Sequence, residues 1–312
     1  MTPIGNDSGP SGDRGRDPGG DHSGNQCGPN GPSLSPADHD RKRHERDLVY
    51  PVLSRRAGGL SVGINLNPGR ECNWACAYCE VDGLVRGTPG PVDIEKLSEE
   101  LDEVLLEART GRWDTEDGPR GAAAVRDISI AGDGEPTLSP VLAEAIDAVA
   151  GARARHGLTD TCDLVIITNG SRVHRPEVLA ALGAFGGHGG KLWFKLDVCT
   201  PVDAEFMNGA PFVRDRVLEN LKTAAAAAPT WIQSMALAID GRGPSEAAVE
   251  HVKSILVNAN AAGADLQGVL LYGLARPSHQ PGADRLSALD PKELAKVAQA
   301  LRASGLPVSA FV

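Results

Sequence analysis

Short apolar runs alternate with stretches of helical periodicity from Leu60 to the C-terminus, and this alternation limits the possible folds more than any other feature. Segment 61–66 is predicted to be a strand, and the apolar residues of 94–108 recur at spacings of three and four, as on one face of a helix. Asp93 stands where it can cap that helix. The strand and helix pair repeats five times, at 127–131 with 141–154, 164–168 with 176–182, 192–196 with 213–228, 231–239 with 245–262, and 267–272 with 291–303.

This alternation predicts an α/β fold with a parallel sheet, because strands joined through helices lie side by side after right-handed crossovers. Six units, with a further edge strand at 307–312, fit a partial (βα)6 TIM-like barrel in a domain of residues 48–312. A doubly wound open sheet is the competing architecture, and periodicity alone does not separate the two.

Residues 1–47 have a different composition from the rest of the chain. They contain nine Gly and six Pro, no aromatic residue and almost no aliphatic residue. Such a segment buries too little apolar surface to offset the entropy of ordering, so we predict a disordered tail. We interpret Cys27 within it as a solvated thiol and the basic run at 41–46 as solvated charge.

Composition sets the broad class of the protein. The chain has 312 residues, 41% of them hydrophobic, which is enough for one large core. No apolar run reaches the length of a membrane span, and the N-terminus lacks the apolar core of a secretory signal, so we expect a cytoplasmic protein without membrane contact. The formal net charge of -10 argues against a surface that binds nucleic acid through its phosphates.

Three cysteines, Cys72, Cys76 and Cys79, follow the first predicted strand in a Cys-x3-Cys-x2-Cys spacing. Cysteines this close would form strained disulfide rings, and cytoplasmic chains rarely form disulfides, so metal binding is the first interpretation. Structural zinc sites and electron-transfer clusters use four protein ligands, whereas three leave a position open for a substrate or cosubstrate. The alternative is a zinc site that takes a fourth ligand such as His156 or Cys199.

Polar residues and glycines follow every predicted strand. The carboxyl ends of the strands are where the active sites of TIM-like barrels lie, so this placement favours the barrel over the open sheet. The candidate residues after the second to fourth strands are Gly132, Asp133, Gly134, Glu135, Thr168, Asn169, Lys195 and Asp197, and segments 240–241 and 272–277 follow the last two strands.

The cysteine spacing and the run Asp-Gly-Glu-Pro at 133–136 resemble those of the radical S-adenosylmethionine (radical SAM) superfamily. The resemblance implies a [4Fe-4S] cluster, with three irons held by the three cysteines and the fourth chelating the amino and carboxylate groups of S-adenosylmethionine. An electron from the reduced cluster, delivered by a flavodoxin or ferredoxin, would then cleave the sulfonium and give a 5'-deoxyadenosyl radical.

The resemblance also implies how the second strand end meets the cosubstrate. Gly132 and Gly134 would let the backbone approach the methionine moiety closely, and Glu135 would pair with its ammonium group. The superfamily has Gly-Gly-Glu-Pro, whereas this chain carries Asp133 in place of the first of those glycines. The backbone contact at that position is therefore the weakest part of the match.

Four further residues have implied cosubstrate roles. Thr168 and Asn169 are placed either to reach the ribose hydroxyls or to close a turn after the strand. Lys195 lies on an apolar strand and needs an anionic partner, which is the methionine carboxylate, Asp197 or a substrate anion. Tyr78 occupies the position where the superfamily has an aromatic residue near the adenine.

Segments 63–68, 134–138, 195–197 and 271–277 are similar to the branch of Fe-S oxidoreductases that includes the wyosine-forming tRNA enzymes. The expected function is a radical SAM enzyme that takes hydrogen from an unidentified small molecule or a peptide or protein side chain. A tRNA-modifying enzyme is one alternative, although it needs a basic face and this domain is acidic. A non-catalytic metal or electron-carrier protein is the second alternative, and it leaves the strand-end residues unexplained.

Overall fold

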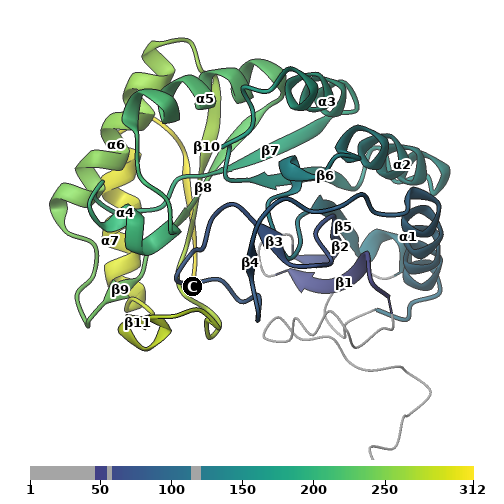
Figure 1. Ribbon diagram of the computed structural model, residues 1–312, viewed down its shortest axis with the longest axis horizontal. Helices are drawn as coiled ribbons and strands as arrows, with labels where there is room; N and C mark the ends of the chain where they lie inside the picture. Colours follow the sequence, from purple (N-terminus) through teal and green to yellow (C-terminus); the bar gives the residue numbers. More distant parts are fainter. Residues whose placement is uncertain (1–45, 55–57, 114–120) are drawn as a thin grey trace, which may run out of the picture. The chain divides into compact units, whose positions relative to one another are not determined.

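Eight strands form one curled sheet in the computed structural model, which describes residues 46–54, 58–113 and 121–312 (Figure 1). The strand order is β1-β2-β5-β6-β7-β8-β10-β12, and all neighbours are parallel except the antiparallel pair β1 and β2. The described residues all belong to one compact unit. The strands are β1 (Val49–Ser54), β2 (Gly59–Ile64), β5 (Val125–Ile130), β6 (Asp163–Thr168), β7 (Gly190–Lys195), β8 (Thr230–Met235), β10 (Leu266–Tyr272) and β12 (Val308–Phe311).

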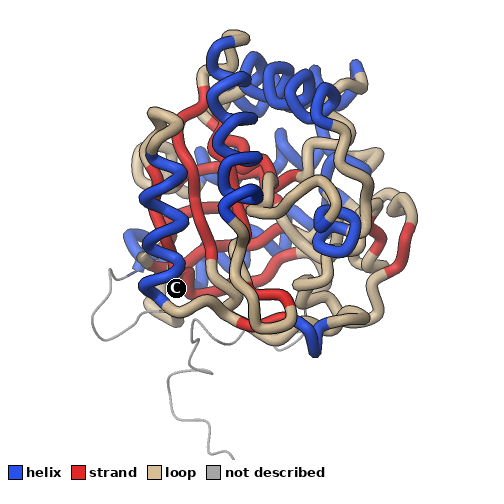
Figure 2. The backbone as a smooth tube through the Cα atoms, turned by 90° about the vertical axis from the view of Figure 1, so that its left-hand side faces the viewer, coloured by secondary structure: helices blue, strands red, loops and turns tan. Residues whose placement is uncertain are grey.

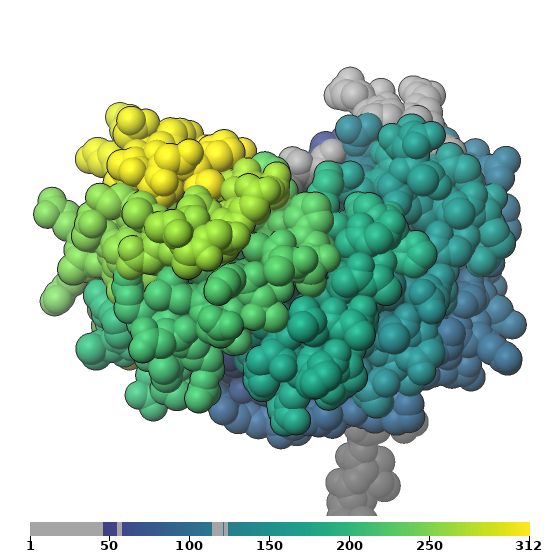
Figure 3. Space-filling view, turned by 90° about the horizontal axis from the view of Figure 1, so that it is seen from above, coloured from purple at the N-terminus to yellow at the C-terminus, as the bar shows by residue number. Residues whose placement is uncertain are grey.

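Helices connect successive parallel strands and form an arc around the outer face of the sheet (Figure 1). In the space-filling view the surface passes from blue through green to yellow, so the units lie next to one another in sequence order (Figure 3). The connecting helices are α1 (Ile94–Arg109), α2 (Leu142–Arg155), α3 (Pro176–Gly187), α5 (Arg214–Ala227), α6 (Glu246–Ala261) and α7 (Pro291–Arg302).

The main hydrophobic core lies between the sheet and these helices. Alternate strand residues such as Ile128 and Ile130 enter it, together with helix residues such as Leu97 and Leu101, and all four are fully buried. The opposite, concave face of the sheet carries a different set of side chains, because successive residues of a strand point to opposite faces. That concave face holds the site, and Figure 2 shows the strands lying inside the surrounding helices and loops.

The predicted six strand and helix units and the last edge strand are confirmed, and the sheet is a partial barrel rather than a flat doubly wound sheet. Asp93 caps α1 as expected, since its Oδ1 accepts from the backbone N–H of Glu95 at 2.9 Å. The strand predicted over 231–239 ends at Met235. A separate short strand, β9 (Ala238–Ile239), follows it and pairs with β11 (Leu286–Ser287).

Strand β1 was not predicted, although its residues are apolar. The run contains Pro51, and proline cannot donate a ladder hydrogen bond, so it is confined to special positions in sheets. The strand lies at the edge of the sheet, where a missing donor is tolerated. Two residues assigned to the tail also contact α1: Arg46 pairs with Glu107 at 2.9 Å, and Asp47 pairs with Lys96 at 2.5 Å.

The remaining residues of the predicted tail, Cys27 included, lie outside the described residues, so the tail and its boundary at 47 stay predictions. No helix in the described ranges combines the length and apolar character that crossing a membrane requires. His156, weighed as a zinc ligand, lies instead at the end of α2, where its Nε2 is 2.9 Å from Oδ1 of Asp102.

Candidate active site

A pocket of about 360 Å³ lies on the concave face of the sheet, between the carboxyl ends of the strands and the loop that carries the cysteines. Thr168 and Asp197 are the two predicted site residues that do not line it. The ten that do are Cys72, Cys76, Tyr78, Cys79, Gly132, Asp133, Gly134, Glu135, Asn169 and Lys195.

The cysteines lie on one irregular loop, residues 65–87, which we call the cysteine loop. Cys72 is in the two-residue strand β3 (Glu71–Cys72), which pairs with β4 (Val85–Arg86) later in the same loop. The middle of the loop is fixed by a short helix, α4 (Asp203–Asn208), because the N–H of Ala77 donates to the carbonyl of Met207 at 2.9 Å. The loop therefore takes its shape from an element far away in sequence.

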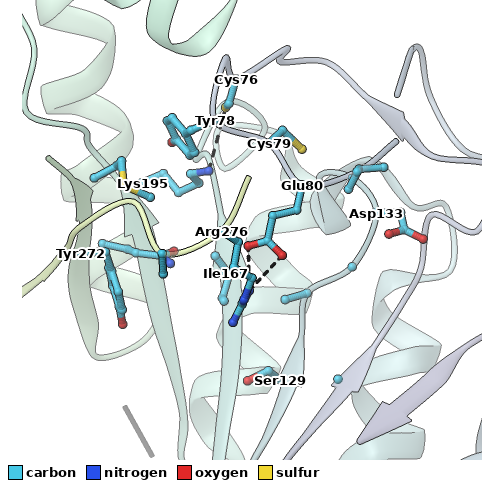
Figure 4. A pocket seen from close by; sticks show the side chains of 18 of the residues that line it. Cys76, Tyr78, Cys79, Glu80, Ser129, Asp133, Ile167, Lys195, Tyr272 and Arg276 are labelled. Carbon is cyan, nitrogen blue, oxygen red and sulfur yellow. Dashed lines mark hydrogen bonds and ion pairs between the residues drawn. The ribbon is translucent and has the colours of Figure 1, made fainter. Parts of the chain in front are cut away.

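Nitrogen donors surround the sulfur atoms of two of the cysteines. The backbone N–H of Trp74 is 3.4 Å from Sγ of Cys72. Nδ2 of Asn208 and Nζ of Lys195 are 3.8 and 3.9 Å from Sγ of Cys76, and Figure 4 shows Lys195 directed toward that sulfur. Such donors stabilise negative charge on sulfur. Burial acts in the other direction and outweighs the Trp74 N–H, so the pKa of the Cys72 thiol is raised to about 11.

Asp197 organises the wall beside Cys76 rather than the pocket surface. Its Oδ2 accepts from the hydroxyl of Tyr78 and, at 2.6 Å, from Nδ2 of Asn208, while its Oδ1 accepts from the N–H of Met235 at 2.9 Å. Burial and the adjacent Asp197 carboxylate raise the pKa of Tyr78 well above its usual range. Asp197 thus fixes the orientation of Tyr78.

Lys195 lies between the Tyr78 ring and the cysteine sulfurs. Its Nζ is 4.9 Å from the centre of the ring, a cation–π arrangement. Burial lowers the pKa of Lys195, but the negative charges of the Cys76 thiolate and Asp197 outweigh burial, so its pKa is raised overall. Lys195 is therefore a fixed positive charge in the pocket wall beside the cysteines.

Glu135 joins the ends of two strands. Its Oε1 accepts from the hydroxyls of Thr137 and Thr168 at 2.5 and 2.6 Å, and its Oε2 accepts from the N–H of Asn169 at 2.7 Å. Burial raises the pKa of Glu135 against the effect of these donors. The contacts add a structural role to the predicted role in cosubstrate binding, which stays a prediction.

The glycines after β5 allow two loops to pack together. A Cβ on Gly134 would lie 1.9 Å from the carbonyl oxygen of Glu71, next to Cys72, and a Cβ on Gly132 would lie 2.2 Å from Oδ1 of Asn65. Asn65 in turn donates from Nδ2 to Oδ2 of Asp133 at 2.8 Å. Asp133, the residue that departs from the superfamily pattern, is therefore hydrogen-bonded to Asn65 at the start of the cysteine loop.

We expect Gly134→Ala to destabilise the fold by about 3 kcal/mol, the upper end of the usual cost of overpacking, because backbone lies where the new methyl group would go. Gly183→Ala in α3 is the matched control, since Gly183 is exposed and a Cβ there meets nothing within 4 Å. Helix propensity predicts that this control gains up to about 1 kcal/mol. Urea unfolding of both variants measures the difference, and equal stability would show that the loops are not packed this way.

A segment after β10, residues 276–280, fastens the cysteine loop from the other side. Arg276 pairs with both carboxylate oxygens of Glu80, at 2.7 and 2.9 Å, and Figure 4 shows this pair at the pocket wall. The hydroxyl of Ser278 lies 2.7 Å from the carbonyl oxygen of Ala77 and 3.1 Å from that of Cys79, so its one proton is shared between them or donated to the nearer. These contacts join residues about two hundred positions apart in sequence.

Several residues that shape the site were not singled out from sequence. Asn73 accepts at Oδ1 from Nδ2 of Asn169 at 2.9 Å, and this contact connects the cysteine loop to the end of β6. Asn67 is fully buried and donates from Nδ2 to the carbonyl of Glu71 at 2.9 Å. The sequence signal for these residues was the presence of asparagines near the cysteines. Amides that are buried in a loop usually bind backbone groups, so these asparagines indicated contacts that shape the loop.

Among the described residues, no three His, Cys, Asp or Glu side chains converge as the ligands of a single metal ion. Cys162 and Cys199 are buried and do not line the pocket.

Comparisons with known proteins agree with this architecture. No model of a known protein family matches the chain. The UPF0026 protein of Helicobacter pylori strain 26695 is 28% identical over 223 residues, and that of strain J99 is 27% identical over the same length. Each alignment covers 70% of this chain and 65% of the relative, so the chain spans less than two thirds of these proteins.

Solved structures show the same fold. A radical SAM methyltransferase from Sphaerobacter thermophilus superposes with a TM-score of 0.54 at 16% identity, over 84% of this chain and 68% of that one. A mutant of spore photoproduct lyase with bound AdoMet superposes with a TM-score of 0.53 at 13% identity, over 83% of this chain and 78% of that one. The chain therefore has the fold of the radical SAM enzymes, as its motifs predicted.

Proposed function

We propose that the protein is a radical SAM enzyme in which Cys72, Cys76 and Cys79 hold a [4Fe-4S] cluster and the pocket beside them binds S-adenosylmethionine. When bound, the cluster supplies an iron with an open position and an electron that cleaves the sulfonium to methionine and a 5'-deoxyadenosyl radical. A small molecule or a peptide or protein side chain in the same pocket would lose a hydrogen atom. A flavodoxin or ferredoxin would supply the electron.

One observation carries the proposal. Three cysteines reach a single pocket at the carboxyl ends of the parallel strands, and the two other described cysteines do not. Three thiolate donors fit a cluster with one iron left open, and the nitrogen donors at Cys72 and Cys76 fit sulfur atoms that carry negative charge. An electron carrier would need a fourth protein ligand and no such pocket.

The residues around the pocket have separate tasks in this proposal. Lys195 brings a positive charge next to Cys76, where it can bind the carboxylate of the methionine moiety. Glu135 holds the ends of β5 and β6 in register, so that the backbone of residues 132–134 faces the pocket. Tyr78, oriented by Asp197, supplies an aromatic wall that excludes water.

The binding step is tested with the reduced, cluster-loaded protein. We expect its EPR signal to change when S-adenosylmethionine is added, because the cosubstrate occupies the open iron. Lys195→Met is expected to raise the Kd of this response at least about tenfold, since a buried charge-assisted contact is lost.

Lys191→Met is the matched control for Lys195→Met. Lys191 lies on the same strand, but it is partly exposed and pairs with Asp163 at 2.8 Å, away from the cysteines. The Lys191→Met variant should leave the Kd for S-adenosylmethionine unchanged. Both variants should keep their iron content. An unchanged Kd in Lys195→Met would remove Lys195 from the binding site.

A further inference from the structure

The pocket has one wall whose polar groups the proposed chemistry does not use. Along the inner face of β2 and β5 the side chains are small or polar, and Ser61, Gly63 and Ser129 line the pocket there. Figure 4 shows Ser129 at the end of the pocket away from the cysteines. The facing walls carry larger residues, among them Ile167, Tyr272 and Phe311.

Behind this wall lies a buried carboxylate. Asp127 is only 3% exposed, and it is two residues before Ser129 on the same face of β5 and beside Ser61 in the sheet register. The hydroxyls of Ser61 and Ser129 both donate to its Oδ1, at 2.5 and 2.6 Å. Each hydroxyl has one proton, so the protons are used here and the serine oxygens present lone pairs to the pocket.

Among the described residues, no cation pairs with the Asp127 carboxylate. Within the described ranges, no Lys, Arg or His side chain forms an ion pair with it, and no donor other than the two hydroxyls contacts it. A buried carboxylate with neutral donors alone is costly unless a bound group supplies the opposite charge. The cations that line the pocket, Lys195 and Arg276, contact Cys76 and Glu80 of the cysteine loop instead.

A second wall offers another unused acceptor. Gln233 lines the pocket from β8, and its buried Oε1 accepts no hydrogen bond from any described residue. Buried amide oxygens are nearly always hydrogen-bonded, so this one indicates a donor that comes from outside the chain. Two walls of the pocket therefore present hydrogen-bond acceptors. The Ser61 and Ser129 wall also has the Asp127 carboxylate behind it.

We propose that the Ser61, Asp127 and Ser129 wall is the substrate subsite, and that it takes a protonated amine, amidine or guanidinium group of the substrate. The inference rests on the proposed function, because it assigns the substrate class for the same pocket. A cationic nitrogen donates several hydrogen bonds, which suits acceptor oxygens, and its charge complements Asp127. The apolar facing wall packs against the body of the substrate.

The test uses small probes and the cluster-loaded full chain. Benzamidine carries the cationic group on an apolar ring, and benzamide is its neutral counterpart of the same shape. Ligand-observed NMR titration is expected to give benzamidine a Kd at least about tenfold lower than benzamide. Equal binding of the two probes, or binding of neither, overturns the proposal.

The variant Asp127→Asn should remove the preference for benzamidine, and Ser129→Ala should reduce it. Asp163→Asn is the matched control, because Asp163 lies opposite Asp127 on β6 but is exposed and pairs with Lys191. The Asp163→Asn variant should keep the preference for benzamidine over benzamide. If Asp127→Asn does not fold, which circular dichroism reveals, Ser129→Ala decides. A preference that is unchanged in Asp127→Asn, or in Ser129→Ala where Asp127→Asn does not fold, refutes the subsite.

Failure of this inference differs from failure of the proposed function. Protein whose EPR signal responds to S-adenosylmethionine but which ignores benzamidine refutes the subsite alone. Protein that prefers benzamidine and shows no response to S-adenosylmethionine keeps the cationic subsite and refutes the radical SAM assignment.

Discussion

Anaerobically reconstituted protein is expected to contain about four iron and four sulfide ions per chain, and Cys72→Ala, Cys76→Ala or Cys79→Ala should each abolish the iron-sulfur absorbance. In the proposed cluster each cysteine would be the sole protein ligand of one iron, and the described residues hold no spare thiol on the pocket wall. Iron and sulfide analysis together with the visible spectrum measures the loss.

Cys162→Ala and Cys199→Ala are the controls for the cysteine variants. Cys162 is buried and does not line the pocket, and burial raises its pKa to about 12. Burial raises the pKa of Cys199 as well, with Asp197 and Asp203 acting in the same direction. Both variants should keep their iron. Zinc without sulfide in anaerobically prepared wild-type protein would contradict the cluster assignment.

Reduced, cluster-loaded protein is expected to convert S-adenosylmethionine slowly to 5'-deoxyadenosine and methionine even without its substrate. The reason is that a cosubstrate held at the open iron of the proposed cluster would have its sulfonium next to the electron donor. Dithionite or a flavodoxin serves as donor, and liquid chromatography measures both products. The cysteine variants should give none.

The control for this experiment is Cys199→Ala. Cys199 packs beside Cys76 and Tyr78 but does not line the pocket, so its removal should leave the formation of 5'-deoxyadenosine unchanged. If no donor gives 5'-deoxyadenosine and the EPR signal ignores S-adenosylmethionine, the electron-carrier interpretation replaces the enzyme.

The fold was largely predictable because its elements follow local patterns. Each strand and helix pair has its own periodicity, and Asp93 and Ser245 cap their helices through contacts within three residues. The exceptions are elements whose stability comes from the sheet or from neighbours. Strand β1 contains Pro51 and exists as an edge strand, and α4 is too short to show a period.

The site was predictable only in part, for the same reason. The cysteines and the strand-end residues were found because spacing and position in a unit are local properties. Asn208 and Ser278 were missed, since their roles depend on contacts with Cys76 and Ala77 that span more than a hundred residues. Sequence periodicity contains no information about which distant loops meet.

The fastening of the cysteine loop by residues 276–280 has a consequence for biogenesis. Ser278 and Gln280 bind carbonyls of Ala77 and Val81, at 2.7 and 2.6 Å, so the loop reaches its final conformation only when a segment near the C-terminus is in place. A nascent chain emerges from its N-terminal end, and its cysteines leave the ribosome long before that segment is synthesised. If the cysteines hold the proposed cluster, its insertion would follow the synthesis of this segment, and the three thiols would have to stay reduced until then.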